Sequence, residues 1–105
     1  MAKIWFTNQG YRIIETNWRH GRWEVDLIAE KSNILHFIEV KTKTSRMFGL
    51  PEEQVGPKKI RNLINAAEAY LYAYPQWQRI QFNILAISLQ KNGEAEYFLI
   101  EDVYL

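Results

Sequence analysis

The stretch 37-FIEVKTK-43 carries a charge pattern that an ordinary buried strand does not have. Its aromatic and β-branched residues favour a strand, yet Glu39 lies among them and Lys41 follows two positions later. Because side chains alternate across a strand, Glu39 and Lys41 share one face, about 7 Å apart along the chain. A charge in an apolar strand costs free energy unless another group pairs with it. The stretch therefore predicts a strand whose two charges have partners elsewhere in the fold.

A second strand with paired carboxylates precedes this one. Residues 22–30 (RWEVDLIAE) predict a strand, residues 31–33 a short polar turn, and residues 34–41 the returning strand of a hairpin. If the turn is centred on Ser32, residues whose numbers sum to about 65 face each other. The hairpin then brings distant charges together, because cross-strand neighbours have Cβ atoms roughly 4.5–5.5 Å apart.

This register places three carboxylates and one ammonium in one small patch. Asp26 is expected opposite Glu39, and Glu24 opposite Lys41. Crowded carboxylates repel one another unless a cation lies between them. Oxygen ligands without cysteine suit Mg²⁺ or Mn²⁺ better than zinc. A metal and phosphate site is one interpretation, and a cross-strand charge pair on a solvated sheet face, worth roughly 0.2–1 kcal/mol per contact, is the other.

The rest of the chain predicts an α/β fold, with α and β elements around one mixed sheet of about five strands. Pro57 suits the first turn of a helix, and apolar residues then recur at spacings of three and four. This long helix can act as a crossover between two parallel strands. The further expected elements are a short helix in residues 1–9 and strands at residues 11–18, 79–89 and 95–102.

Length and composition set the class of protein. The chain of 105 residues suits a single domain, residues 1–105, and 48% apolar residues are enough for a core. It has no cysteine, which excludes disulfides and thiolate metal sites. We find no signal peptide and no apolar run near the ~20 residues that a membrane helix needs. We therefore expect a soluble, cytoplasmic protein without a membrane partner.

Basic residues gather in the same half of the chain as the unusual strand. Residues 1–61 hold 11 Lys and Arg against 7 Asp and Glu, whereas residues 62–105 hold 2 against 5. Positive charge in the first turns of a helix opposes the macrodipole, but it is tolerated where a phosphate binds. The side chains that we expect to contact a nucleic acid are Lys43, Arg46, Lys58, Lys59 and Arg61.

The motif formed by Asp26 and 39-EVK-41 resembles the signature of the PD-(D/E)XK, or restriction-endonuclease-like, nuclease superfamily. More narrowly, five ordered blocks between residues 10 and 88 resemble the YraN-like family of small bacterial proteins. These blocks are 10-GYRIIETNWR-19, 24-EVDLIAE-30, 38-IEVKTK-43, 48-FGLPEEQV-55 and 66-AAEAYL-71. The resemblance implies a restriction-endonuclease-like core with one long helix after the ExK strand. Family members usually begin with a longer helix that carries a glycine-glutamate motif, whereas here the helix is expected to be short and without an acidic residue.

The resemblance also implies a reaction, the Mg²⁺- or Mn²⁺-dependent hydrolysis of phosphodiester bonds in DNA. Asp26 and Glu39 would bind the metal, and Lys41 would orient or activate the attacking water. Glu24 is a further carboxylate of the catalytic motif and would support one of the ligands. The alternative is a catalytically inactive nucleic-acid-binding or adaptor module that retains the nuclease fold. The sequence leaves DNA versus RNA open, and a homodimer is a reasonable arrangement for so small a domain.

The histidines and tryptophans near these strands predict structural roles. His36 alternates with the face of Glu39 and is expected to point away from it, while His20 is expected in a turn. Trp18 and Trp23 flank that turn, where core packing is the expected role and stacking on nucleic-acid bases the alternative.

Overall fold

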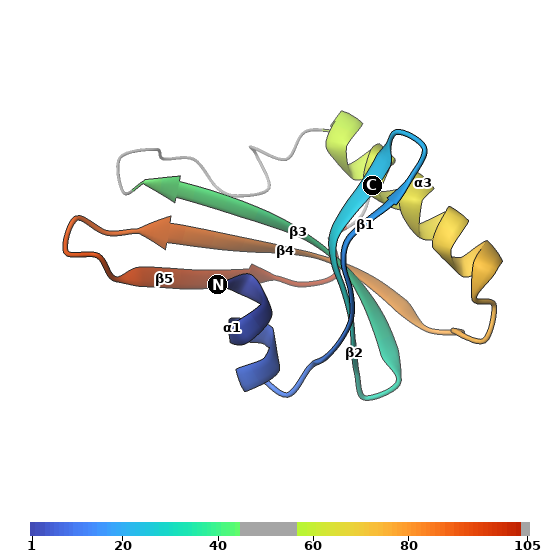
Figure 1. The fold of residues 1–105 in the computed structure, drawn as a ribbon, viewed down its shortest axis with the longest axis horizontal. Helices are drawn as coiled ribbons and strands as arrows, with labels where there is room; N and C mark the ends of the chain where they lie inside the picture. The colour runs from blue at the N-terminus through green and yellow to red at the C-terminus, as the bar shows by residue number, and fades with distance from the viewer. Residues whose placement is uncertain (45–56, 104–105) are drawn as a thin grey trace.

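The computed structural model describes residues 1–44 and 57–103, and these ranges form two helices and five strands (Figure 1). The elements are α1 (Ala2–Asn8), β1 (Arg12–His20), β2 (Trp23–Lys31), β3 (Ile34–Thr44), α3 (Pro57–Ala73), β4 (Ile80–Leu89) and β5 (Ala95–Ile100). Each predicted element is present, with ends shifted by at most three residues. The α/β prediction is therefore confirmed.

The five strands form one mixed sheet in the order β1-β2-β3-β4-β5. All neighbouring strands are antiparallel except β3 and β4, which run parallel. Parallel neighbours need a crossover connection, and α3 lies within that connection as the sequence predicted (Figure 1). The strand with Glu39 and Lys41 is consequently the central strand of the sheet.

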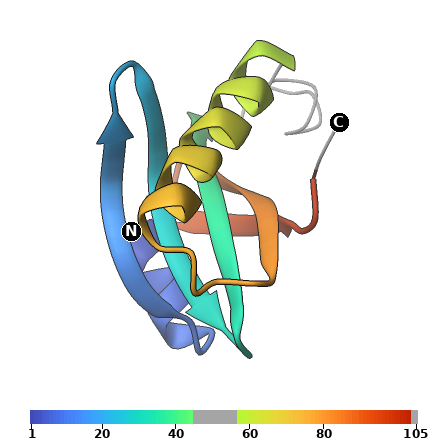
Figure 2. The same cartoon turned by 90° about the vertical axis from the view of Figure 1, so that its right-hand side faces the viewer.

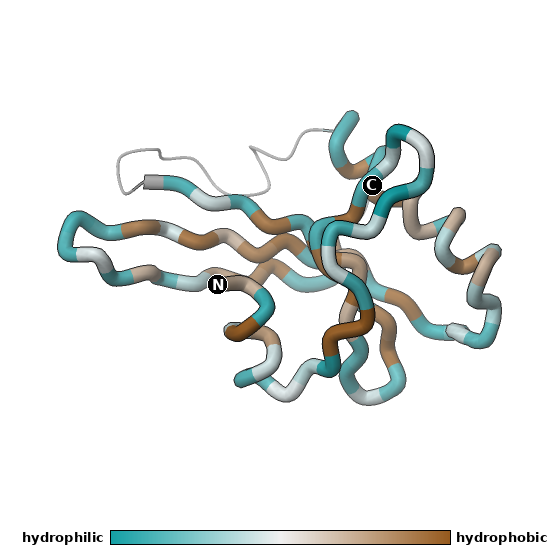
Figure 3. Tube along the Cα trace, viewed as in Figure 1, coloured by the Kyte–Doolittle hydropathy of each residue, from teal (hydrophilic) through white to brown (hydrophobic). Residues whose placement is uncertain are grey.

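The two helices cover opposite faces of the sheet (Figure 2). Under α3, Val25, Ile28 and Phe37 pack against Leu63 and Tyr70 of the helix. The face below α1 holds a second cluster, formed by residues Phe6, Tyr11, Leu27, Ala29, Ile38, Leu85 and Ile87. Hydrophobic residues accordingly follow the middle of the sheet, while the ends of the hairpins are hydrophilic (Figure 3). No helix in residues 1–44 and 57–103 is long and apolar enough to cross a membrane.

Local sequence explains where both helices end. Gly10 follows α1 with a φ of +91°, a left-handed conformation that glycine adopts without steric cost, and the chain then turns into β1. The α3 helix begins at Pro57, whose fixed φ suits the first helical position, and it ends at Ala73, two residues before Pro75. The basic first turn of α3 lies at one end of the sheet face that this helix covers (Figure 1).

Candidate functional site where two strands separate

The β2 and β3 strands separate at the position of the predicted carboxylate pair. Their ladder runs from Lys31↔Ile34 to Leu27↔Ile38, which confirms the predicted register sum of 65. Beyond Ile38, β3 continues to pair with β4 as far as Thr44, while β2 continues to pair with β1. Asp26 and Glu39 therefore lie just past the last pair of the ladder, at a fork in the sheet.

A change of face in β2 accompanies the fork. Alternation would place Val25 and Leu27 on the same face. Instead Val25 packs in the cluster under α3, and Leu27 packs in the cluster on the α1 side. The backbone of the neighbouring strand β1 is also irregular opposite Asp26. There Asn17, between the pairs Thr16↔Leu27 and Trp18↔Val25, has a φ of +51°. Asp26 is thus the residue at which the strand reorients.

The Asp26 side chain takes over the hydrogen bond that the ladder no longer supplies. The Val40 backbone N–H donates to Oδ2 of Asp26 over 2.8 Å. A buried backbone N–H without a partner is costly, and this contact satisfies one. Asp26 therefore has a structural task in addition to any chemical one. The same hydrogen bond keeps the Asp26 carboxylate close to Glu39, which precedes Val40 in β3.

Glu39 is a largely buried carboxylate beside a second negative charge. Its side chain is 13% exposed, and Lys59 of α3 donates to its Oε1 atom over 3.5 Å. Burial, and then the Asp26 carboxylate, raise the pKa of Glu39 above its ordinary value, although Lys59 and Lys41 act in the opposite direction. The fork thus brings the Asp26 and Glu39 carboxylates near Lys41 and Lys59, and burial together with the Asp26 charge outweighs what the two lysines do to the pKa of Glu39.

Glu24 lies at the same site but pairs differently from the prediction. The structure pairs Glu24 with Arg19 across the β1–β2 ladder, and the Arg19 Nη2 atom lies 2.6 Å from Oε2 of Glu24. In the described residues, neither Glu24 with Lys41 nor Asp26 with Glu39 is a ladder pair, so direct cross-strand opposition was wrong for both. The physical reason is the fork, because the two strands diverge before their partners can face each other.

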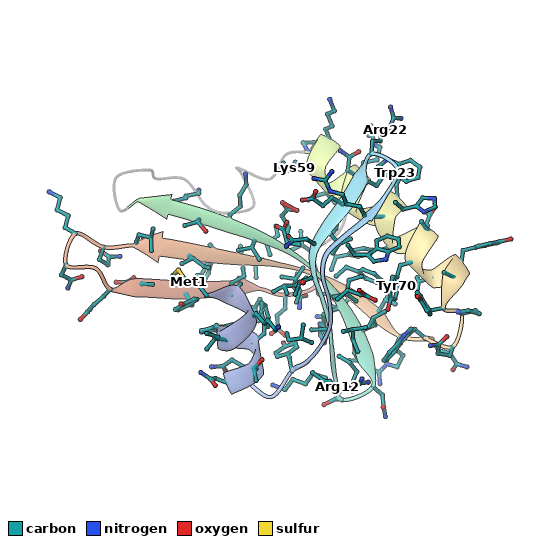
Figure 4. The ribbon with its side chains drawn as sticks, viewed as in Figure 1. Met1, Arg12, Arg22, Trp23, Lys59 and Tyr70 are labelled. Atoms are coloured by element: carbon teal, nitrogen blue, oxygen red, sulfur yellow. The ribbon has the colours of Figure 1, made fainter. Side chains whose placement is uncertain are left out.

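A small cavity of about 110 Å³ opens beside the carboxylates. It is lined by Arg22, Glu24, Glu39, Lys59 and Asn62. Arg22 comes from the tip of the β1–β2 hairpin and Lys59 from the first turn of α3, and the two lie on the same side of the molecule (Figure 4). A cavity with both carboxylates and cations on its walls suits a ligand that carries a metal ion and phosphate oxygens.

Two of the cavity residues were missed by the sequence, although spacing held a signal for each. Arg22 precedes Glu24 by two positions, which is the separation that places side chains on one face of a strand. Asn62 follows Lys59 by three positions, which makes the two neighbours on a helix surface. The ion pair between Lys59 and Glu39 had no such signal, because the two residues are 20 positions apart and lie in different elements, α3 and β3.

The basic residues expected at a nucleic acid are placed unequally. Lys58, Lys59 and Arg61 are exposed at the start of α3, next to the cavity. Lys43 is only half exposed, and its Nζ atom is buried without a hydrogen-bond partner in residues 1–44 and 57–103. Arg46 lies outside the described residues. The start of α3 is therefore the part of the predicted basic surface that the structure places beside the carboxylates.

The carboxylates fit a metal that takes few protein ligands. Among residues 1–44 and 57–103, no group of three or more His, Cys, Asp or Glu side chains is arranged to hold a metal ion. Mg²⁺ is usually bound by one or two carboxylates and completes its coordination with waters and substrate phosphates. Asp26 and Glu39 provide that number of carboxylates, and their mutual repulsion is of the kind that a divalent cation relieves.

The two histidines lie away from this cluster. His36 is buried on the α1 side, as expected from alternation, where its Nδ1 atom is 2.9 Å from Nδ2 of Asn83. His20 is exposed at the last position of β1, and its ring is nearly parallel to the rings of Trp18 and Trp23. Neither histidine lines the cavity beside Glu39.

The sheet and its helices define a small α/β fold in which a pair of carboxylates lies where the β2 and β3 strands separate. The model of the uncharacterised protein family UPF0102 matches residues 1–87, and the chain belongs to this family. A UPF0102 protein of Cytophaga hutchinsonii is 48% identical over 88 residues, covering 83% of this chain and 77% of the relative. A UPF0102 protein of Chlorobium phaeobacteroides strain BS1 is 41% identical over 105 residues, covering 97% and 83%. The YraN-like resemblance is thereby confirmed at the level of the family.

Proposed function

We propose that this chain is a Mg²⁺- or Mn²⁺-dependent nuclease domain of the PD-(D/E)XK type, which hydrolyses phosphodiester bonds in DNA. The observation that carries the proposal is the fork at Asp26 and Glu39. Two half-buried carboxylates lie there with Lys41 on the same strand and Lys59 within 3.5 Å of Glu39. A largely buried carboxylate with a raised pKa, such as Glu39, beside a second carboxylate is more typical of a functional site than of a sheet surface.

Each residue of the site has a task in this reaction. Asp26 and Glu39 would hold the metal, which supplies Lewis acidity to the phosphate and the attacking water when bound. The Asp26 carboxylate is fixed for that role by the Val40 N–H. Lys41 would hold the attacking water and offset the charge that develops on the phosphate oxygens. Arg22 and Lys59, on the cavity wall, would neutralise the neighbouring backbone phosphate.

A titration with Mn²⁺, followed by calorimetry, tests the metal site. Asp26→Asn and Glu39→Gln each remove one charge with little change of shape, so each is expected to weaken Mn²⁺ binding at least tenfold. Glu94→Gln, in the exposed turn after β4, is the matched control and should leave binding unchanged. Lys41→Gln should retain Mn²⁺ binding and lose cleavage of DNA. Binding that is the same in the wild type and in both carboxylate variants would refute a metal-dependent nuclease.

A second candidate is a nucleic-acid-binding or adaptor module without catalysis. Two features favour it. The α1 helix has the sequence AKIWFTN with no acidic residue. In residues 1–44 and 57–103, no three His, Cys, Asp or Glu side chains are arranged to hold a metal ion. This module would bind DNA through the start of α3 and would not need the carboxylates. DNA binding that survives both Asp26→Ala and Lys41→Ala, with no cleavage by the wild type in Mn²⁺, would favour the module over the nuclease.

A further inference from the structure

The tip of the β1–β2 hairpin, residues 18–23, carries a row of aromatic rings. The rings of Trp18 and His20 have centroids 6.1 Å apart and planes inclined by 11°. His20 and its cross-strand partner Trp23 are 6.4 Å apart with planes inclined by 17°. These values correspond to offset, nearly parallel rings. His20 is exposed and the two tryptophans beside it are partly exposed, so the row presents aromatic surface at the hairpin tip.

The two tryptophans of the row pack against the core, whereas the histidine is exposed to solvent. Trp18 meets the buried Tyr70 of α3 edge to face, with ring centroids 5.2 Å apart. Trp18 and Trp23 are half-buried and pack against the core under α3, as expected for their structural role. His20, in contrast, is exposed. The core therefore holds the tryptophans in place, and the histidine extends the aromatic surface towards solvent.

Positive charge surrounds this aromatic row. Arg22 is exposed at the tip, which is hydrophilic in Figure 3, and the exposed Arg19 is paired there with Glu24. Arg22 also lines the cavity that contains Glu39 and Lys59, so the tip and the carboxylate site share a wall. Figure 4 shows Arg22 and Trp23 together on the hairpin, with Lys59 at the nearby end of α3. A polyanionic chain that contacts the tip would therefore meet Arg22 and Lys59 on the wall of the cavity that contains Glu39.

We propose that the hairpin tip is a stacking platform for unpaired nucleic-acid bases, and that it directs the site towards strands that leave a duplex. This inference deepens the proposed nuclease function by naming its substrate class. Aromatic rings next to arginines are the means by which proteins bind single strands without reading sequence. In an intact duplex the base faces are stacked on one another, and only a frayed end, a fork or a single strand can offer them to a side chain.

Binding of three fluorescent DNA probes in EDTA tests the platform without any contribution from a metal or from cleavage. The probes are a blunt duplex, the same duplex with two single-stranded arms, and a single arm alone. The wild type is expected to bind the forked probe about tenfold more tightly than the blunt one, since one stacked base contributes about that much. Contact with the arms should also quench tryptophan fluorescence, because Trp18 and Trp23 lie in the row.

Two variants of His20 separate stacking from charge. His20→Ala should lose most of the preference for the forked probe, whereas His20→Phe retains a ring and should keep it. Tyr72→Ala, which removes an aromatic side chain that is 91% exposed on α3, is the control and should not change the preference. His20 and Tyr72 are both exposed, so the variants are expected to fold, and circular dichroism of each variant checks this.

Equal affinity of the wild type for forked and blunt probes would overturn the platform, as would an unchanged preference in His20→Ala. Failure of the nuclease proposal looks different. A preference for the forked DNA probe in EDTA, with no Mn²⁺ binding and no cleavage, would support the stacking platform and refute the nuclease activity. Metal-dependent cleavage with equal rates on forked and blunt DNA would retain the enzyme and remove the platform.

Discussion

The central strand β3 has a buried polar group on each of its faces, and the two groups differ in their hydrogen-bond and charge partners. On the α1 side, His36 is 4% exposed and pairs with Asn83, whose Oδ1 atom accepts a hydrogen bond from the Asp102 N–H over 3.0 Å. On the α3 side, Glu39 is 13% exposed, and its closest cation is Lys59 at 3.5 Å. One face therefore has a hydrogen-bonded network of neutral groups, and the other has a largely buried carboxylate with a second carboxylate and two lysines around it.

The difference is one of stability: one polar group supports the fold and the other does not. A buried neutral network that satisfies its hydrogen bonds stabilises one arrangement of the fold. Asn83 does this by tying β4 to both β3 and the segment after β5. Crowded carboxylates do not stabilise a fold, because burial and mutual repulsion both disfavour their ionised forms. The buried charge of Glu39 therefore does not stabilise the fold, and the proposed metal would offset its cost.

The first and largest expected effect concerns the hydrogen-bonded network. Asn83 is 0% exposed, and Asn83→Ala would leave the buried Nδ1 of His36 and the part-buried N–H of Asp102 without their partner. Each unsatisfied buried group costs about 1–3 kcal/mol, so we expect a loss of about 3 kcal/mol in the free energy of unfolding. Urea denaturation measures this value. Gln81→Ala, at a half-buried position of the same strand, should cost less than about 1 kcal/mol. Equal losses in the two variants would mean that the network has no special weight.

The second prediction concerns the pH dependence of that network. Burial lowers the pKa of His36 from its ordinary value of 6.5, although Glu101 acts in the opposite direction. As the pH falls below 6.5, the unfolded chain takes up a proton that the folded state does not, so the free energy of unfolding should fall. The slope is limited to about 1.4 kcal/mol per pH unit for one proton. Urea midpoints between pH 5 and pH 7.5 should show this slope in the wild type and a weaker one in His36→Gln.

The sequence predicted the parts of this comparison that depend on local pattern. Alternation placed Glu39 and Lys41 on one face and His36 on the other, and the polar turn at residues 31–33 set the hairpin register. The long helix predicted the parallel pair of strands. These features follow from periodicity along a short segment, which is why a single sequence was enough for them.

The remaining features depend on contacts between distant segments. The partner of His36 is Asn83, 47 positions away, and both residues look like ordinary strand positions in the sequence. The fork could not be predicted either, since a regular alternating strand gives no sign that β2 will reorient at Asp26. That reorientation explains both the wrong opposition of Glu24 with Lys41 and the unexpected bond from Val40 to Asp26. In the same way, only the tertiary fold brings Lys59 to Glu39.

The third prediction separates the two tasks of Asp26. Asp26→Asn keeps an oxygen that can accept the Val40 N–H, whereas Asp26→Ala removes it. We therefore expect Asp26→Ala to lose about 1 kcal/mol in the free energy of unfolding, and Asp26→Asn to lose less. Both variants should weaken Mn²⁺ binding to a similar extent, because both remove the charge. Calorimetry together with urea denaturation makes this comparison. Equal stabilities for the two variants would show that the bond to Val40 contributes little.

The smallest expected effect has the opposite sign to that of His36. Because the pKa of Glu39 is raised in the folded state, the folded state holds a proton that the unfolded chain has lost once the pH exceeds about 4.5. The free energy of unfolding should therefore fall as the pH rises from about 4.5 through the folded pKa, and Glu39→Gln should remove this fall.

The stabilisation by Glu39→Gln at pH 7.5 should be 1 kcal/mol or less, since the lost contact with Lys59 is long and Lys59 is 55% exposed. At pH 4 the advantage should nearly disappear. Mn²⁺ provides a second measurement, because a cation that binds only the folded state raises the urea midpoint of the wild type and not that of the variant. A variant that is less stable than the wild type at pH 7.5 would mean that Glu39 supports the fold, and the contrast between the two faces of β3 would then be lost.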